Sequence, residues 1–185
     1  MIFLFVSLLA LPWQAWLHLK LKFSGFYNRV KQTKIYNYIS TNLAGFSLAF
    51  GFFTLYLVFA SVINNPRFDV DDIFFDADGL NYRIRLTTDN WHDFYWRSVH
   101  PFMILLFKPP VDLIAFFLKG DKLWGAYVFI ALGGAACVYL VWLFIKSATG
   151  NSVYASLIAA LLGFTASHLI FGSLLESYIF LAASL

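Results

Sequence analysis

Three long apolar stretches constrain this chain more than any other feature of its sequence. Residues 43–63, 123–145 and 153–175 comprise 21, 23 and 23 residues and contain no formally charged side chain. A helix rises 1.5 Å per residue, so each stretch is long enough to cross the roughly 30 Å hydrocarbon core of a bilayer. We therefore predict an all-α integral membrane protein with spans at these positions.

The composition agrees with a membrane environment. Of the 185 residues, 61% are hydrophobic and only 12% are charged, whereas an ordinary soluble domain is about a quarter charged. This excludes a soluble monomer and a disordered chain. Aromatic residues make up 21% of the chain and suit lipid-facing surfaces better than a nucleic-acid platform, so we expect no nucleic-acid partner. The single cysteine, Cys137, excludes disulfides and is interpreted as a small buried hydrophobe.

The two ends of the sequence are also apolar. Residues 1–19 lack the basic start and small-residue cleavage site of a signal peptide, so we interpret them as a further span; a cleaved segment and a misplaced start are the alternatives. Residues 177–185 begin another apolar segment, but nine residues rise only about 14 Å as a helix. We therefore expect the sequence to be the amino-terminal part of a longer protein.

The distribution of basic residues predicts the orientation. Residues 20–42 hold five basic side chains and no acid, which places them in the cytoplasm by the positive-inside rule. The span at 43–63 then leaves the cytoplasm, and residues 64–122 form an extracytoplasmic loop. The span at 123–145 returns, a tight turn follows, and the span at 153–175 leaves the cytoplasm again.

One part of the outer loop is apolar without being a clear span. Residues 102–118 are interrupted by Lys108, Pro109, Pro110 and Asp112. Proline breaks helices, and charge at the centre of a bilayer is costly. The pattern favours two short helices that lie in the membrane interface.

The acidic residues are concentrated in the outer loop. Residues 65–101 contain seven of the ten acids, namely Asp69, Asp71, Asp72, Asp76, Asp78, Asp89 and Asp93. Asp76 and Asp78 follow an apolar run close to the membrane. A carboxylate near low dielectric has a raised pKa, which suits it to accept a proton from a hydroxyl group. The alternative interpretation is an ordinary solvated turn.

Other polar residues border the same region. Arg97 and His100 precede the interfacial segment and are interpreted either as a snorkelling anchor or as a clamp for a lipid-linked phosphate, to which Lys108 could add charge. Glu176, the only glutamate, is either a boundary residue at the outer end of a span or a pocket residue. His168 lies within a predicted span, where an interhelical hydrogen bond is the commoner role.

The order of these features resembles the amino-terminal portion of the GT-C membrane glycosyltransferases. An exiting span is followed by an acidic outer loop with Asp76-Ala77-Asp78, then by Arg97-Ser98-Val99-His100-Pro101, interfacial segments, two tightly linked spans and Glu176. The sequence is similar in particular to bacterial members of the protein O-mannosyltransferase and aminoarabinose-transferase superfamily. The resemblance implies a partial GT-C-like bundle in the bacterial plasma membrane, with its site on the extracytoplasmic face. The family usually has eleven or more spans, and residues 1–19 are not part of its pattern.

The resemblance also implies an activity. Such enzymes pass a sugar from a polyprenyl-phosphate donor to a lipid, glycan or protein acceptor. Asp76 or Asp78 would be the base or orient the acceptor, with Asp71 and Asp72 in reserve. Arg97, His100 and Lys108 would hold the donor phosphate, and Glu176 would line the pocket. No cofactor is expected, although a divalent cation held by Asp-x-Asp is the alternative, and the 185 residues alone are expected to be inactive.

A multi-span transporter or a non-catalytic structural membrane subunit is the competing interpretation. Charged residues at helix breaks inside the membrane would favour a transporter. The predicted spans carry almost no charge, and the acids are gathered in one outer loop. This distribution favours surface chemistry on a lipid carrier.

Overall fold

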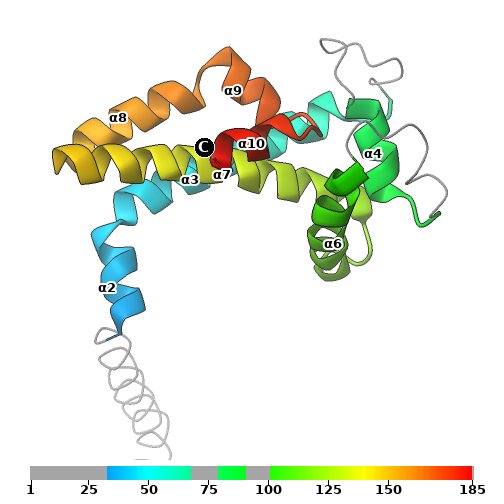
Figure 1. The fold of residues 1–185 in the computed structure, drawn as a ribbon, viewed down its shortest axis with the longest axis horizontal. Coiled ribbons are helices and arrows are strands. Elements are labelled where there is room, and N and C mark those ends of the chain that lie inside the picture. Colours follow the sequence, from blue (N-terminus) through cyan, green and yellow to red (C-terminus); the bar gives the residue numbers. More distant parts are fainter. Residues whose placement is uncertain (1–32, 68–78, 91–100, 185) are drawn as a thin grey trace, which may run out of the picture. The chain divides into compact units, whose positions relative to one another are not determined.

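A computed structural model describes residues 33–67, 79–90 and 101–184 of the chain (Figure 1). Every regular element in these ranges is an α-helix, which confirms the all-α prediction. The helices are α2 (Lys34–Thr41), α3 (Leu43–Ile63), α4 (Gly79–Thr87), α6 (Pro101–Phe117), α7 (Lys122–Thr149), α8 (Ser152–Gly163), α9 (Ala166–Phe171) and α10 (Tyr178–Ser184). The chain divides into two compact units, Met1–Leu43 and Ala44–Leu185.

The first unit contributes the short helix α2 to the described residues. Thr33 caps its amino terminus by accepting a hydrogen bond from the Tyr36 N–H at 3.2 Å, and Asn42 ends it. This helix occupies part of the basic segment at 20–42, for which the sequence predicted no helix. Residues 1–19, the predicted additional span, lie outside the described residues.

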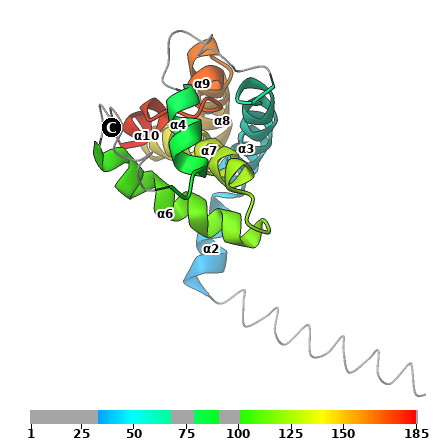
Figure 2. The same ribbon diagram turned by 90° about the vertical axis from the view of Figure 1, so that its right-hand side faces the viewer.

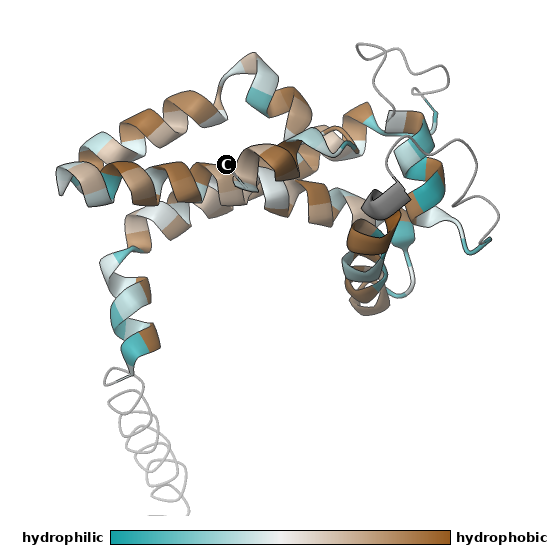
Figure 3. Ribbon diagram, in the orientation of Figure 1, coloured by the Kyte–Doolittle hydropathy of each residue, from teal (hydrophilic) through white to brown (hydrophobic). Residues whose placement is uncertain are grey.

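Within the described part of the chain, two helices are long and apolar enough to cross a membrane, α3 and α7. In α3 only 17% of the most apolar window is buried, whereas the core helix of a soluble protein would be mostly covered. Phe50, Val58 and Val62 are all more than half exposed, and Figure 3 shows hydrophobic colouring along both helices. The prediction of long apolar helices at 43–63 and 123–145 is therefore confirmed.

The tight turn predicted after the second of these helices is also present. Asp121 caps the start of α7 by accepting from the Trp124 N–H, and Gly150 ends it in the left-handed conformation at φ 69°. Asn151 then caps α8 through hydrogen bonds from the Val153 and Tyr154 N–H groups. The turn reverses the chain, so that α8 packs back along α7 (Figure 1).

The predicted span at 153–175 is not one continuous helix. Helix α8 has 12 residues and rises only about 18 Å; α9 and a non-helical turn at 172–177 follow. Tyr56 of α3 organises the break. Its hydroxyl donates to the Gly163 carbonyl at 3.0 Å and lies 2.9 Å from His168 Nδ1. The tyrosine thus bonds a carbonyl at the end of α8, while Thr165 caps the start of α9.

The prediction of two short helices over 102–118 is wrong, because one continuous helix is present there. Helix α6 continues through Pro109 and Pro110 and crosses α7 at a steep angle, as the two views in Figures 1 and 2 show. Prolines remove the N–H donors of two helical bonds. An ion pair between Lys108 and Asp112 at 3.2 Å spans the interruption, and buried residues of α6 pack on α7.

The contact between α6 and α7 depends on Gly125. A Cβ atom at this position would lie 2.8 Å from the Val111 carbonyl oxygen and 3.2 Å from Ala115 Cβ. We expect Gly125→Ala to lower the free energy of unfolding by about 1–3 kcal/mol, because overpacking outweighs the better helix propensity of alanine. Thermal unfolding in detergent, followed by circular dichroism, measures this.

Gly51→Ala is the matched control in another apolar helix. Apart from its own helix backbone, nothing in the described structure lies within 4 Å of a Cβ built at Gly51, so this variant should be unchanged or more stable by at most about 1 kcal/mol. Equal losses in both variants would show that close packing at Gly125 is not the cause.

Candidate functional site

Asn64 is the centre of a buried polar network where α3 ends. Its side chain is fully buried, and its Nδ2 donates to the Ala60 carbonyl at 2.8 Å and to the Ser173 carbonyl at 2.9 Å. Its Oδ1 accepts from the Leu175 N–H at 3.0 Å. The side-chain amide of Asn64 therefore provides hydrogen-bond partners for two backbone groups of the turn at 172–177, the Ser173 carbonyl and the Leu175 N–H.

The backbone carbonyl of Asn64 connects two further helices. It accepts a hydrogen bond from the Tyr127 hydroxyl of α7 at 2.9 Å and another from Arg83 Nη1 of α4 at 3.2 Å. Arg83 is only 8% exposed, and a guanidinium at the carboxyl end of a helix is favoured by the helix dipole. We call Asn64, Arg83, Tyr127 and the turn at 172–177 the polar node.

The polar node holds both flanks of residues 68–78, which we call the acidic segment because they include five of the aspartates of the outer loop. Asn64 precedes that segment, and α4, which carries Arg83, begins directly after it. Gly79, the first residue of α4, packs against Leu174 of the turn, with 3.2 Å between an added Cβ and Leu174 Cδ1. The acidic segment thus links the end of α3 to the start of α4, and both of these contact the turn at 172–177.

Glu176 lies within the turn rather than at an exposed helix end. It is 5% exposed, and its Oε2 accepts from the Ser177 N–H at 2.9 Å. Its side chain borders a cavity of about 10 Å³ that is otherwise lined by apolar residues, among them Leu86 and Phe107. Such a volume corresponds to about one water molecule. Glu176 is therefore a buried carboxylate beside a small cavity.

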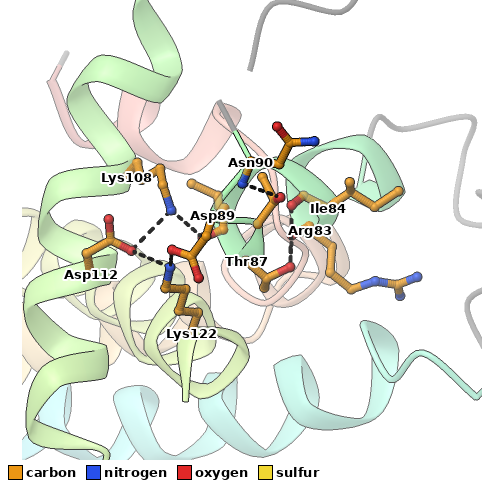
Figure 4. Close-up of polar contacts among 10 residues, drawn as sticks. Arg83, Ile84, Thr87, Asp89, Asn90, Lys108, Asp112 and Lys122 are labelled. Carbon is orange, nitrogen blue, oxygen red and sulfur yellow. Dashed lines mark hydrogen bonds and ion pairs between the residues drawn. The ribbon is translucent and has the colours of Figure 1, made fainter. Parts of the chain in front are cut away.

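Charged residues form a second cluster nearby, between α4, α6 and the start of α7 (Figure 4). Lys108 pairs with Asp112 and donates to the Leu86 carbonyl at 3.4 Å. Lys122 lies 3.9 Å from Asp112 and pairs closely with Asp89. The hydrogen bond from Lys122, with the attraction of its charge, lowers the pKa of the Asp89 carboxyl below its ordinary value. Two cations and two carboxylates thus compensate one another.

The structure describes only part of the site predicted from the sequence. Glu176 and Lys108 both lie near Leu86, whose side chain lines the cavity beside Glu176 and whose carbonyl accepts from Lys108. The other predicted residues lie outside the described ranges, and their roles stay predictions: Asp71, Asp72, Asp76, Asp78, Arg97 and His100.

Sequence reasoning missed Asn64, Arg83 and Tyr127. One signal for Asn64 was available, because it is the first polar residue after a charge-free stretch of 21 residues. Nothing in the local sequence distinguishes Arg83 from the neighbouring Arg85, because only the packing of α4 decides which of them is buried.

Within the described ranges, no three His, Cys, Asp or Glu side chains are grouped closely enough to hold a metal ion. Comparisons with protein-family models, with curated proteins and with solved structures find no match to this chain.

Proposed function

We propose that this chain belongs to an integral membrane glycosyltransferase that transfers a sugar from a polyprenyl-phosphate donor to a lipid, glycan or protein acceptor. The reaction takes place on the extracytoplasmic face of a bacterial plasma membrane. The membrane placement is supported by α3 and α7, which are long, apolar and incompletely covered by the rest of the chain.

The observation that carries the proposal is the polar node. It fixes the two flanks of the acidic segment, beside α6 and close to the buried Glu176. In a membrane, the node would lie near one interface, because Asn64 follows α3 and Tyr127 lies in the second turn of α7. An acceptor that reaches the acidic segment and a donor phosphate at headgroup depth would meet there.

The proposed chemistry is the one that the resemblance to the GT-C glycosyltransferases implies. Asp76 or Asp78 removes a proton from the acceptor group or orients it for attack on the anomeric carbon of the sugar. The glycosidic C–O bond to phosphate breaks, and the configuration at this carbon inverts. Arg97, His100 and Lys108 stabilise the charge that develops on the departing polyprenyl phosphate. No divalent cation is required in this scheme.

Sugar transfer by the full-length protein in lipid vesicles tests the proposal. We expect radiolabelled sugar to move from a polyprenyl-phosphate donor to an acceptor. Glu176→Gln should reduce the rate about tenfold or more, because a carboxylate in the reaction pocket is lost. Tyr178→Phe, an equally conservative change at an exposed neighbour, is the matched control and should leave the rate unchanged. Absence of transfer with a panel of polyprenyl-phosphate sugars would contradict the proposal.

One observation favours a transporter as the second candidate. The break between α8 and α9 and the buried Glu176 in a non-helical turn resemble the discontinuous helices that bind ions and substrates in transporters. Solute flux into sealed vesicles without a sugar donor distinguishes the two functions. Flux that Glu176→Gln abolishes, with no sugar transfer, would support the transporter.

A further inference from the structure

Helix α2 has one apolar face and one polar face. Residues three and four positions apart lie on the same side of a helix, so Ile35, Tyr38 and Ile39 share the apolar face. Asn37 and Ser40 lie on the opposite face. Ile35 is 72% exposed and Ile39 is 43% exposed, and no residue of α2 is buried. Single exposed hydrophobic residues are ordinary, but here they are gathered on one face of one helix.

The charge of the chain around α2 is of one sign. The basic segment at 20–42, which contains α2, holds five basic residues and no acid. Lys34 is the first residue of α2, and the other four precede the helix in the sequence: Lys20, Lys22, Arg29 and Lys31. An amphipathic helix in a basic segment is typical of chains that lie on an anionic lipid surface.

The sequence also places α2 next to a membrane. Only Asn42, which ends α2, separates it from Leu43, the first residue of the candidate span α3. The eight residues of α2 rise only about 12 Å as a helix. Wherever α3 enters a bilayer, the apolar face of α2 is therefore tethered close to the lipid headgroups, whereas a partner protein would have to be recruited to it.

We propose that α2 binds the anionic phospholipid surface of the membrane, with Ile35 and Ile39 in the headgroup layer and with lipid phosphate groups around Lys34. The inference depends on the membrane placement of α3 but not on sugar transfer, and it would hold for a transporter as well. It concerns the end of α3 away from the polar node, since α2 precedes α3 and Asn64 follows it.

Fluorescence quenching in lipid vesicles tests the proposal with the whole chain. A fluorophore is attached to Ile39→Cys on the apolar face or to Asn37→Cys on the polar face, and the lipids carry a nitroxide quencher near the headgroup. Cys137 is buried, and the chain without an added cysteine measures its background labelling. In vesicles that contain phosphatidylglycerol we expect strong quenching at position 39 and weak quenching at position 37. In phosphatidylcholine alone, quenching at position 39 should be weaker.

A label on Phe50→Cys separates this test from the membrane placement. Phe50 lies within α3 and is 70% exposed, so lipids that carry the nitroxide deep in the acyl chains should quench it in both kinds of vesicle. Quenching at position 50, with none at position 39 or with equal quenching there in both kinds of vesicle, would overturn the proposal and leave α3 as a span. A label at position 39 that is shielded from iodide in the water as well as from the lipid quencher would also overturn it, because protein would then cover the face. Absence of quenching at position 50 would overturn the membrane placement as well.

Three substitutions connect the binding with the apolar face and with the charge. Ile35→Asp and Asn37→Asp add the same negative charge to α2, but only the first removes an apolar side chain from the proposed contact. With the label at position 39 as the readout, Ile35→Asp should lower the ratio of bound to unbound α2 at least about tenfold more than Asn37→Asp. Lys34→Gln should lower this ratio about fivefold in vesicles with phosphatidylglycerol and leave it unchanged in phosphatidylcholine. Equal losses in the two aspartate variants, or no loss in Lys34→Gln, would contradict the proposal.

Discussion

Sugar transfer by the full-length protein is expected to fall by about 100-fold or more when Asp76 and Asp78 are both changed to asparagine. Asparagine keeps the size of the side chain but cannot take the proton of an acceptor hydroxyl. Because either aspartate could serve, the single variants should show which one is the base. Transfer from a polyprenyl-phosphate donor in vesicles, at equal amounts of membrane-inserted protein, measures the loss.

Asp89→Asn is the matched control, since Asp89 lies beyond α4 with 87% of its side chain exposed and pairs with Lys122. This variant should retain full activity. Loss of transfer in Asp71→Asn or Asp72→Asn instead would move the catalytic role to the reserve pair. Full activity in both single variants and in the double variant of Asp76 and Asp78 would contradict the assignment of the base.

The largest expected effect on stability is that of Asn64→Leu. Leucine has a similar volume but no amide, so the Ser173 carbonyl and the Leu175 N–H would lose their partners in a fully buried place. Each unsatisfied buried group costs about 1–3 kcal/mol, and we expect a total loss of about 2–5 kcal/mol. Unfolding in detergent, followed by the fluorescence of the tryptophans, including the fully buried Trp142, measures it.

Asn65→Leu makes the same chemical change one residue further along the chain. Asn65 is partly exposed, and its side-chain oxygen accepts from the Arg67 N–H at 3.0 Å, so its variant should lose less than about 1 kcal/mol. A variant of Asn64 that is as stable as that of Asn65 would show that the turn at 172–177 does not depend on the amide. Sugar transfer should fall in the Asn64 variant even at temperatures where it remains folded, because the acidic segment would lose one of its fixed flanks.

Helices that are decided by local composition could be predicted from the sequence. The 21 apolar residues of α3 and the core of α7 need no long-range partner to be recognised. The segment at 153–175 is equally apolar, but a tyrosine more than a hundred positions away takes over hydrogen bonds at its break. In α6, the two prolines favour a break in the helix. The ion pair that spans them and the packing of α6 on α7 support a continuous helix instead.

In the candidate site, too, only the features that are marked by the local sequence could be predicted. The sequence singled out Glu176 because it is the only glutamate, and it predicted an interhelical hydrogen bond for His168, which the contact with Tyr56 confirms. It could not identify Arg83, because burial of one arginine rather than another depends on how α4 packs. The acidic cluster is evident in the sequence, but its local geometry lies outside the described residues.

The hydrogen bonds of Tyr56 and Asn64 imply an order of assembly. The break after α8 and the turn at 172–177 have backbone groups whose partners are side chains of α3 and its end. A buried backbone group without a hydrogen-bond partner is costly. In the membrane placement proposed above, the later part of the chain therefore reaches its final structure only after α3 is in place, and ribosomal synthesis delivers the two in that order. A rearranged gene that encoded α8 to α10 ahead of α3 should yield a chain that degrades before it assembles.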